Sequence, residues 1–224
     1  MQRGNASKIL LVEGKSEQFL IPELMEANGI DWPARNPPIY IEDCGGYEKI
    51  ADQDAIAAEL QNSNLTALGI VVDADEYPDR RWQSLRNACL PSIPDLPETL
   101  PDTGLIHSHF LIPERQIQFG IWIMPDNLQR GMLETFLAYL LPEQTTPLWQ
   151  YAQEVVQVAK NELKAKIKAV QVDKANIHTW LAWQDEPGLQ LHTAVQKKVF
   201  DPNHPRAQEF VTWFNTLYDF EDLQ

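Results

Sequence analysis

Over its first half, the chain alternates short apolar runs with amphipathic segments. Lys8–Val12 and Leu68–Val72 are rich in leucine, isoleucine and valine, which is typical of strands buried on both faces of a parallel sheet. Pro37–Glu42 is predicted as a further strand between them. Apolar residues at helical spacing predict a helix after each strand, over Ser16–Asn28, Tyr47–Leu60 and Asp79–Leu90. This order favours a mostly parallel sheet flanked by helices.

Two more strands, Leu105–Ile112 and Gln118–Met124, are predicted around a turn at 113–116, where they can pair as a hairpin. The next helix is expected at Asn127–Leu141, with Asp126 and Gln129 as a capping pair. Before these strands, the segment Pro91–Asp102 contains four prolines and is predicted as a surface excursion. It is either a plain connector or a lid or docking loop.

From Pro147 onward the pattern is helical. One long amphipathic helix is predicted from Leu148 to Ile167, a shorter one over Ala175–Trp183, and a last one over Phe210–Tyr218. We therefore expect an α/β domain at residues 6–142 and a helical extension at 147–224 that packs on or next to it.

Carboxylates stand where the two apolar strands end: Glu13 after the first, and Asp73 and Asp75 after the third. In open parallel sheets, sites lie beyond the carboxyl ends of the strands. At ~5 Å and an effective dielectric of ~20, each pair of carboxylates repels by roughly 3 kcal/mol, which a divalent cation such as Mg²⁺ would offset. In an extended segment Asp73 and Asp75 share a face and can reach one ion. The alternatives are a turn-forming Asp pair and a Glu13 stabilised by a helix dipole.

The amino-acid composition excludes few classes of protein or function. Hydrophobic residues make up 44% and charged residues 22% of the 224-residue chain, which is ordinary for a globular protein. The net charge of −14 disfavours nonspecific adhesion to nucleic acid, so a nucleic-acid role needs a local basic patch or a metal. Two cysteines argue against a disulfide framework and suit a reducing cytoplasm. No apolar stretch approaches the ~20 residues that span a membrane.

The pieces Val12-Glu13-Gly14 and Val71–Asp75, in this order and after parallel-strand patterns, resemble the Toprim domain of topoisomerases, primases, recombination proteins and the overcoming-lysogenization-defect (OLD) nucleases. The resemblance covers roughly residues 6–142 and implies a Toprim-like, Rossmannoid sheet. Val12–Glu17 with Ile21–Leu24 looks closest to the OLD-type branch. Ile123–Asn127 followed by Gly131–Glu134 also resembles a small bacterial family of stand-alone Toprim-like proteins to which no activity is assigned.

The resemblance implies Mg²⁺ or Mn²⁺ as cofactor and Glu13 as a metal ligand or as the general acid/base. Lys15 would stabilise charge on a phosphate, although a solvated loop lysine is the alternative. The metal ligands to be tested are Glu13, Asp73, Asp75, Glu17, Asp126 and Glu134. Among these, Glu17 could simply open a helix and Asp126 could be a helix cap. Glu134 stands beside an apolar stripe, which indicates that it points inward.

Basic side chains supply weaker candidates for contact with DNA or RNA. Lys160, Lys164 and Lys168 would share one side of the long helix, where they contact phosphates or only line a solvated face. Arg80 and Arg81, after Asp75, could hold an anion near the metal. A homodimer or an unidentified protein partner is also compatible with the helical tail. His107 and His109 can share a strand face, but no zinc signature surrounds them.

Three functions remain open from the sequence. The first is a Mg²⁺-dependent phosphodiester-processing, nuclease-like protein of the Toprim type. The second is a metal- or nucleotide-binding regulatory module that keeps the fold without turnover. The third, weaker hypothesis is a nucleotide-sugar transferase, because such enzymes also use Asp-x-Asp. A P-loop is rejected, since Ile9 stands where that motif needs its first glycine.

Overall fold

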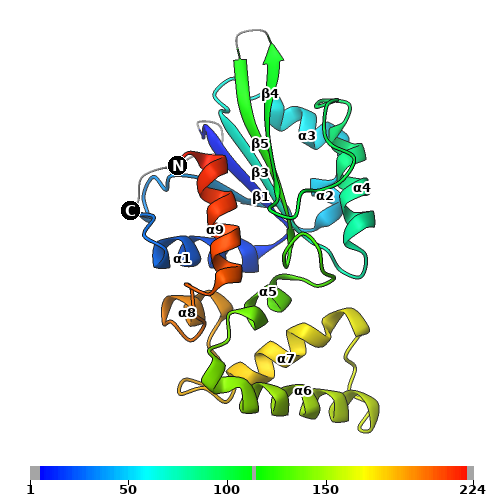
Figure 1. Cartoon of the computed structure of the whole chain (residues 1–224), viewed down its shortest axis with the longest axis vertical. Coiled ribbons are helices and arrows are strands. Elements are labelled where there is room, and N and C mark those ends of the chain that lie inside the picture. Colours follow the sequence, from blue (N-terminus) through cyan, green and yellow to red (C-terminus); the bar gives the residue numbers. More distant parts are fainter. Residues whose placement is uncertain (1–5, 113–114, 221–224) are drawn as a thin grey trace.

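A computed structural model, which describes residues 6–112 and 115–220, shows a mostly parallel five-stranded sheet flanked by helices (Figure 1). The strands are β1 (Lys8–Val12), β2 (Tyr40–Asp43), β3 (Ala67–Asp73), β4 (Leu105–Ile112) and β5 (Arg115–Met124). Their order is β2-β1-β3-β5-β4, and β4 pairs antiparallel with β5 while the other pairs are parallel. The Rossmann-like α/β class predicted from the sequence is therefore confirmed, as is the hairpin.

The helices follow the predicted alternation in the first half and dominate the second half. They are α1 (Lys15–Ala27), α2 (Tyr47–Ile50), α3 (Gln53–Leu60), α4 (Pro78–Cys89), α5 (Leu133–Tyr139), α6 (Thr146–Asn161), α7 (Val172–Leu181), α8 (Leu191–Gln196) and α9 (Pro205–Tyr218), with short 3-10 turns η2 (Glu143–Thr145) and η3 (Ala169–Gln171). Of the expected hairpin turn at 113–116, residues 113 and 114 lie outside the described residues, and the other two belong to β5.

The sheet is buried on both faces because its strands are apolar at nearly every position. Along β1, Ile9 and Leu11 pack in the core under α2, α3 and α4, whereas Leu10 and Val12 pack in the core under α1, α5 and α9. Alternation of side chains along a strand explains this division. Each face of the sheet therefore has its own helical layer (Figure 1).

The C-terminal helix α9 belongs to the α/β core. The Tyr218 hydroxyl donates to the Ile9 carbonyl at 2.8 Å, and Trp213 Nε1 donates to the Leu105 carbonyl at 2.9 Å. The chain thus returns to the sheet after α6 and α7, which pack on each other at one end of the molecule (Figure 1). Only part of the predicted extension at 147–224 is therefore peripheral to the sheet.

The helix predicted at Asn127–Leu141 begins later, at Leu133. Asp126 Oδ1 accepts hydrogen bonds from the Leu128 and Gln129 amides, as a cap would, but Asn127 has a left-handed φ of 65° and the segment closes as a turn. Asn127 Oδ1 also accepts from the Ile123 amide at 2.8 Å, which fastens this turn to β5. These side-chain hydrogen bonds of Asp126 and Asn127 stabilise a turn in place of the first turns of the predicted helix.

Two other helix predictions were wrong in extent. The long helix to Ile167 ends at Asn161, because Leu163 is 75% exposed and Lys164 adopts a left-handed φ of 60°, so no buried face continues beyond α6. The expected common side of Lys160, Lys164 and Lys168 does not exist. The helix predicted at Tyr47–Leu60 is split into α2 and α3 by Asp52, whose Oδ1 accepts from the Ala55 amide at 2.8 Å.

Within the described residues, no helix combines the length and apolar character that crossing a lipid bilayer requires.

The fit of α9 on the sheet gives a stability prediction. A methyl group at Gly69 would collide with the Tyr218 hydroxyl and lie 2.9 Å from side-chain carbons of Leu10 and Leu217. We expect Gly69→Ala to lower the free energy of unfolding by about 1–3 kcal/mol, as overpacking does, measured by urea denaturation.

The control is a double-mutant cycle with Tyr218→Phe. Alone, this change removes the bond to Ile9 and costs about 1 kcal/mol. In the Gly69→Ala background it also removes the collision with the hydroxyl and leaves the contacts with Leu10 and Leu217, so the two costs should add only in part. Strict additivity would contradict this account of the packing.

Candidate functional site

Two carboxylates meet where β1 and β3 end. The parallel register pairs Val12 with Val71, so Glu13 and Asp73 leave the sheet side by side. The Asp73 amide donates to Glu13 Oε1 at 2.8 Å, and the Leu133 amide at the start of α5 donates to Asp73 Oδ1 at 3.0 Å. Both acids are thus held at the carboxyl edge of the sheet, as the sequence predicted.

Two further acids approach this point from helices. Glu17 in the first turn of α1 is 7% exposed, and Glu134 in the first turn of α5 is 3% exposed. Both interact electrostatically with Asp73, and Glu17 also interacts with Glu13. We call Glu13, Glu17, Asp73 and Glu134 the acidic cluster.

The acidic cluster resists ionisation, because it is buried and its members lie close together. Burial is the largest cause of the raised pKa of Glu17, about 7, and the charges of Glu134 and Glu13 add to it. The pKa of Asp73 is raised well above its usual value by burial and then by the other three acids. Burial also raises the pKa of Glu13, against the opposing effects of the Asp73 amide and Arg81. Loss of solvation therefore dominates at all three groups.

One cation of the tail reaches the acidic cluster. Lys174 Nζ at the start of α7 lies 2.9 Å from Glu134 Oε1. Burial lowers the pKa of Lys174, but the bond to Glu134 and the charges of Glu134, Glu17 and Asp73 raise it overall. The sequence pattern did not single out Lys174, because its position depends on how α7 packs against α5.

The two acids of Asp-x-Asp diverge. Asp75 has a left-handed φ of 54°, and its backbone exchanges hydrogen bonds of 2.9 and 2.8 Å with Gly131. Its carboxylate pairs with Arg81 of α4, whereas Asp73 bonds the start of α5 on the other face of the sheet. The expectation that Asp73 and Asp75 share a face is therefore wrong, because the segment is a turn and not extended.

Asp126 lies apart from the acidic cluster. Besides capping its own turn, it accepts a hydrogen bond from the Tyr139 hydroxyl at 3.3 Å and lines a separate pocket with Arg206 of α9. Burial first, and then the Asp126 carboxylate, raise the pKa of Tyr139 to about 12. The structure does not bring Asp126 to the other predicted ligands.

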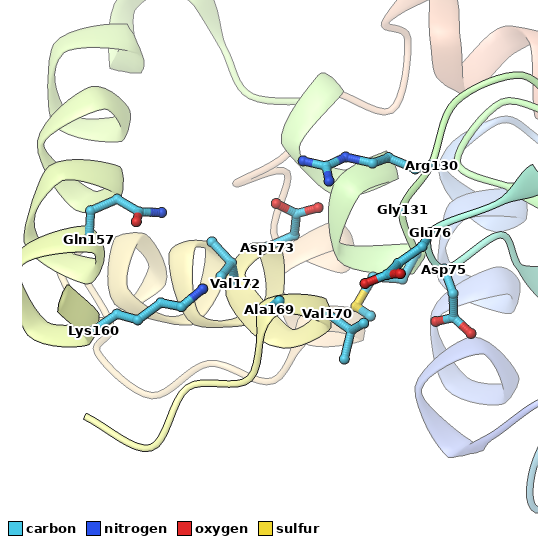
Figure 2. A pocket seen from close by; sticks show the side chains of 11 residues that line it. Asp75, Glu76, Arg130, Gly131, Gln157, Lys160, Ala169, Val170, Val172 and Asp173 are labelled. Atoms are coloured by element: carbon cyan, nitrogen blue, oxygen red, sulfur yellow. The ribbon is translucent and has the colours of Figure 1, made fainter. Parts of the chain in front are cut away.

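Two pockets flank Asp75, at the same end of the sheet as the acidic cluster. The first has a volume of about 270 Å³. Figure 2 shows Lys160 pointing into it from one side and Arg130 from the other, with Asp75 and Glu76 on the side opposite Lys160. The second, of about 510 Å³, is lined by Arg80 and Arg81 together with two tyrosines.

Some of the basic residues predicted to contact phosphates line these pockets, and others do not. Lys160, Arg80 and Arg81 line the pockets. The Arg81 guanidinium lies 3.7 Å from the centre of the Tyr47 ring, and that of Arg80 4.5 Å from the centre of the Tyr77 ring. Lys15, Lys164 and Lys168 are exposed and line neither pocket. Arg130 was missed, since an isolated arginine in a turn carries no signal in the sequence.

The acidic cluster offers the hard oxygen donors that Mg²⁺ prefers. In the part of the chain that the structure describes, however, no three of its carboxylates have oxygens within 4.8 Å of one another. Binding an ion therefore requires the glutamate side chains to rotate inward and Lys174 to move aside. A bound divalent cation would favour the ionised forms of Glu17 and Asp73 and displace the protons that their raised pKa values keep on them.

Comparisons with known proteins place the chain in one family. A family model described as "Protein of unknown function (DUF3226)" matches residues 7–219, and the chain belongs to this family. No curated protein and no solved structure matches the chain.

The raised pKa values predict how stability depends on pH. Because the folded state keeps protons on Glu13, Glu17 and Asp73 that the unfolded state releases, the free energy of unfolding should fall as pH rises from about 4.5 to about 7. Glu17 alone accounts for on the order of 3 kcal/mol. Urea unfolding at about pH 5 and pH 8 measures the loss, and Glu17→Gln should make it smaller by that order.

Glu154→Gln, on the exposed side of α6, is the matched control and should leave the loss unchanged. Mg²⁺ should restore stability at pH 8 in the wild type. Equal pH dependence in the wild type and Glu17→Gln would contradict the assigned origin of the effect.

Proposed function

We propose that this protein is a Mg²⁺-dependent phosphodiester-processing, nuclease-like protein of the Toprim type. The observations that carry the proposal are the acidic cluster at the ends of β1 and β3 and, at the same end of the sheet, two pockets beside Asp75 that arginine and lysine side chains line. Carboxylates suit a divalent cation, and guanidinium and ammonium groups suit the phosphates of a substrate. Within the described residues Cys44 and Cys89 form no disulfide, which suits a cytoplasmic location as part of the same proposal.

Within this proposal Glu13, Glu17, Asp73 and Glu134 hold Mg²⁺ or Mn²⁺. The ion would supply charge stabilisation at a phosphate and a water of lowered pKa. Glu13 is the residue placed to exchange a proton, since one of its oxygens is fixed by the Asp73 amide and its pKa is raised. Arg130, Lys160 and Arg80 would position DNA or RNA through its phosphates. Lys15 remains a weaker candidate because it lies outside both pockets.

The second candidate function is a metal- or nucleotide-binding regulatory module without turnover. The ion pair between Lys174 and Glu134 favours it, because a resident cation already occupies part of the acidic cluster. Such a module would bind Mg²⁺ or a nucleotide and leave phosphodiesters intact. The partner that recognises the ligand-bound form would then be a second copy of the chain or another protein.

Cleavage assays separate the two functions. We expect Mg²⁺- or Mn²⁺-dependent cleavage of single- or double-stranded DNA or of RNA, reduced at least about 100-fold by Glu13→Gln and by Asp73→Asn. Asp126→Asn is the control, because Asp126 lies outside the acidic cluster, and it should keep full activity. Activity that survives both substitutions would exclude the proposed mechanism. Calorimetric Mg²⁺ binding that needs Asp73, without any cleavage, would select the regulatory module.

Phosphate contacts can be tested by salt dependence. Each phosphate contact removed lowers the slope of log affinity against log salt by about 1. We expect Arg130→Gln and Lys160→Gln each to produce such a decrease in binding of a single-stranded oligonucleotide, measured by fluorescence anisotropy. Lys164→Gln and Lys168→Gln are matched controls outside the pockets and should change neither slope nor affinity. Equal effects of all four substitutions would argue for diffuse charge and against a defined path.

A further inference from the structure

A second group of metal-ligating side chains lies on the edge strand β4. His107 and His109 follow the buried Leu105 by two and four residues, so all three point to the sheet face under α2, α3 and α4. His107 Nε2 lies 3.1 Å and His109 Nδ1 3.4 Å from the same oxygen of Asp95. Among the described residues, this is the one set of three such side chains whose ligand atoms lie within 4.8 Å of one another.

The proline-rich excursion holds Asp95 in place. Its neighbours Ile93 and Leu96 are 0% and 4% exposed, so the backbone is anchored in the core on both sides of Asp95. Arg86 Nε donates to the Pro97 carbonyl at 2.6 Å, and Trp82 Nε1 donates to the Glu98 carbonyl at 2.9 Å. The segment is therefore a clamped loop that presents one carboxylate to two imidazoles, and not a free connector.

The two imidazoles and the carboxylate face one another at distances that suit a shared ion. His107 Nε2 is buried and lies 3.1 Å from the Asp95 oxygen, so that carboxylate is the group it faces. A tetrahedral ion with bonds of ~2.0–2.2 Å holds neighbouring ligand atoms roughly 3.3–3.6 Å apart, close to the 3.1 and 3.4 Å found here. The Asp95 side chain is 62% exposed, which leaves the outer side of the site open to solvent.

We infer that Asp95, His107 and His109 form a site for a divalent transition metal of the Zn²⁺ class, with an open coordination position. Two imidazoles and one carboxylate are a ligand set of Zn²⁺ and disfavour Mg²⁺, and contraction to bonds of ~2.0–2.2 Å closes the site. The metal fastens the excursion of residues 91–102 to β4.

This site is separate from the acidic cluster. His107 pairs with Phe119, which lies five residues before Met124, the partner of Asp73. Five residues of strand span roughly 17 Å. The two sites therefore sit in different places on one sheet, and the zinc site is independent of the proposed function.

Zinc binding to the full chain tests the inference, with Zn²⁺ titrated against a chromophoric chelator. We expect His107→Ala/His109→Ala to weaken binding more than about 100-fold, beyond the 10- to 100-fold cost of losing an outer-shell partner. His178→Ala, an exposed histidine of α7, is the matched control and should bind as the wild type does. Asp95→Asn, a change in an exposed side chain that leaves the core intact, should weaken binding about 10-fold.

An atom-specific readout identifies the site. Zn²⁺ should shift the side-chain nitrogen resonances of His107 and His109 in ¹⁵N NMR and leave those of the other histidines unchanged. It should also raise Tm in the wild type and in Asp73→Asn, but not in the double histidine variant. Zinc affinity unaffected by the double variant, or unshifted resonances of the two histidines, would overturn the inference and leave an ordinary histidine–carboxylate contact.

Discussion

The confinement of like charge at the ends of β1 and β3 is the constraint on which this molecule's chemistry depends. Parallel pairing of two strands that each continue into a carboxylate brings Glu13 and Asp73 together whatever the rest of the chain does. The hydrogen bond from the Asp73 amide to Glu13 keeps the two groups there. With Glu17 and Glu134 added at low exposure, the fold accepts a cost of burial and of mutual repulsion that one lysine and a peripheral arginine only partly offset. A core built for stability alone would not concentrate four acids in this way.

Helices from the C-terminal part of the chain add the basic side chains near the acidic cluster. Lys174 and Lys160 come from α7 and α6, while the acids come from the α/β part. Helix α9 then returns to the sheet, so that Tyr218 and Trp213 bond the strands directly. The boundary predicted at residues 142–147 therefore marks a change in the sequence pattern. It does not divide the structure into two independent units. Truncation of the chain near residue 142 would remove the cover from a face of the sheet, together with both lysines.

Sequence reasoning succeeded where burial alone decides the structure. The strands around Ile9 and Ile70 are apolar at almost every position, as expected for a parallel sheet covered on both faces. It failed where a side chain competes with the helix: Asp126 and Asn127 close a turn that delays α5 to Leu133. It also failed at Asp75, since a left-handed turn fixed by Gly131 reverses the direction that an extended segment would give. Glu13 and Asp73 were found because they follow strand ends, Glu17 because it opens a helix, and Glu134 because it stands beside an apolar stripe. The position of Lys174 depends instead on packing between distant helices.

One sheet thus presents two environments of opposite ligand character. At its carboxyl edge the donors are carboxylate oxygens, with a pKa near 7 at Glu17, so charge density governs what can bind there. At β4 the proposed donors are two imidazoles of the strand and the carboxylate of Asp95, where ligand preference and geometry would govern binding. A hard cation and a borderline transition metal would therefore distribute between the two places by their chemistry, without any need for the protein to exclude either ion by size. The two places lie farther apart than a Debye length, so their charges are largely screened from each other. An ion bound at one place therefore has little electrostatic effect at the other.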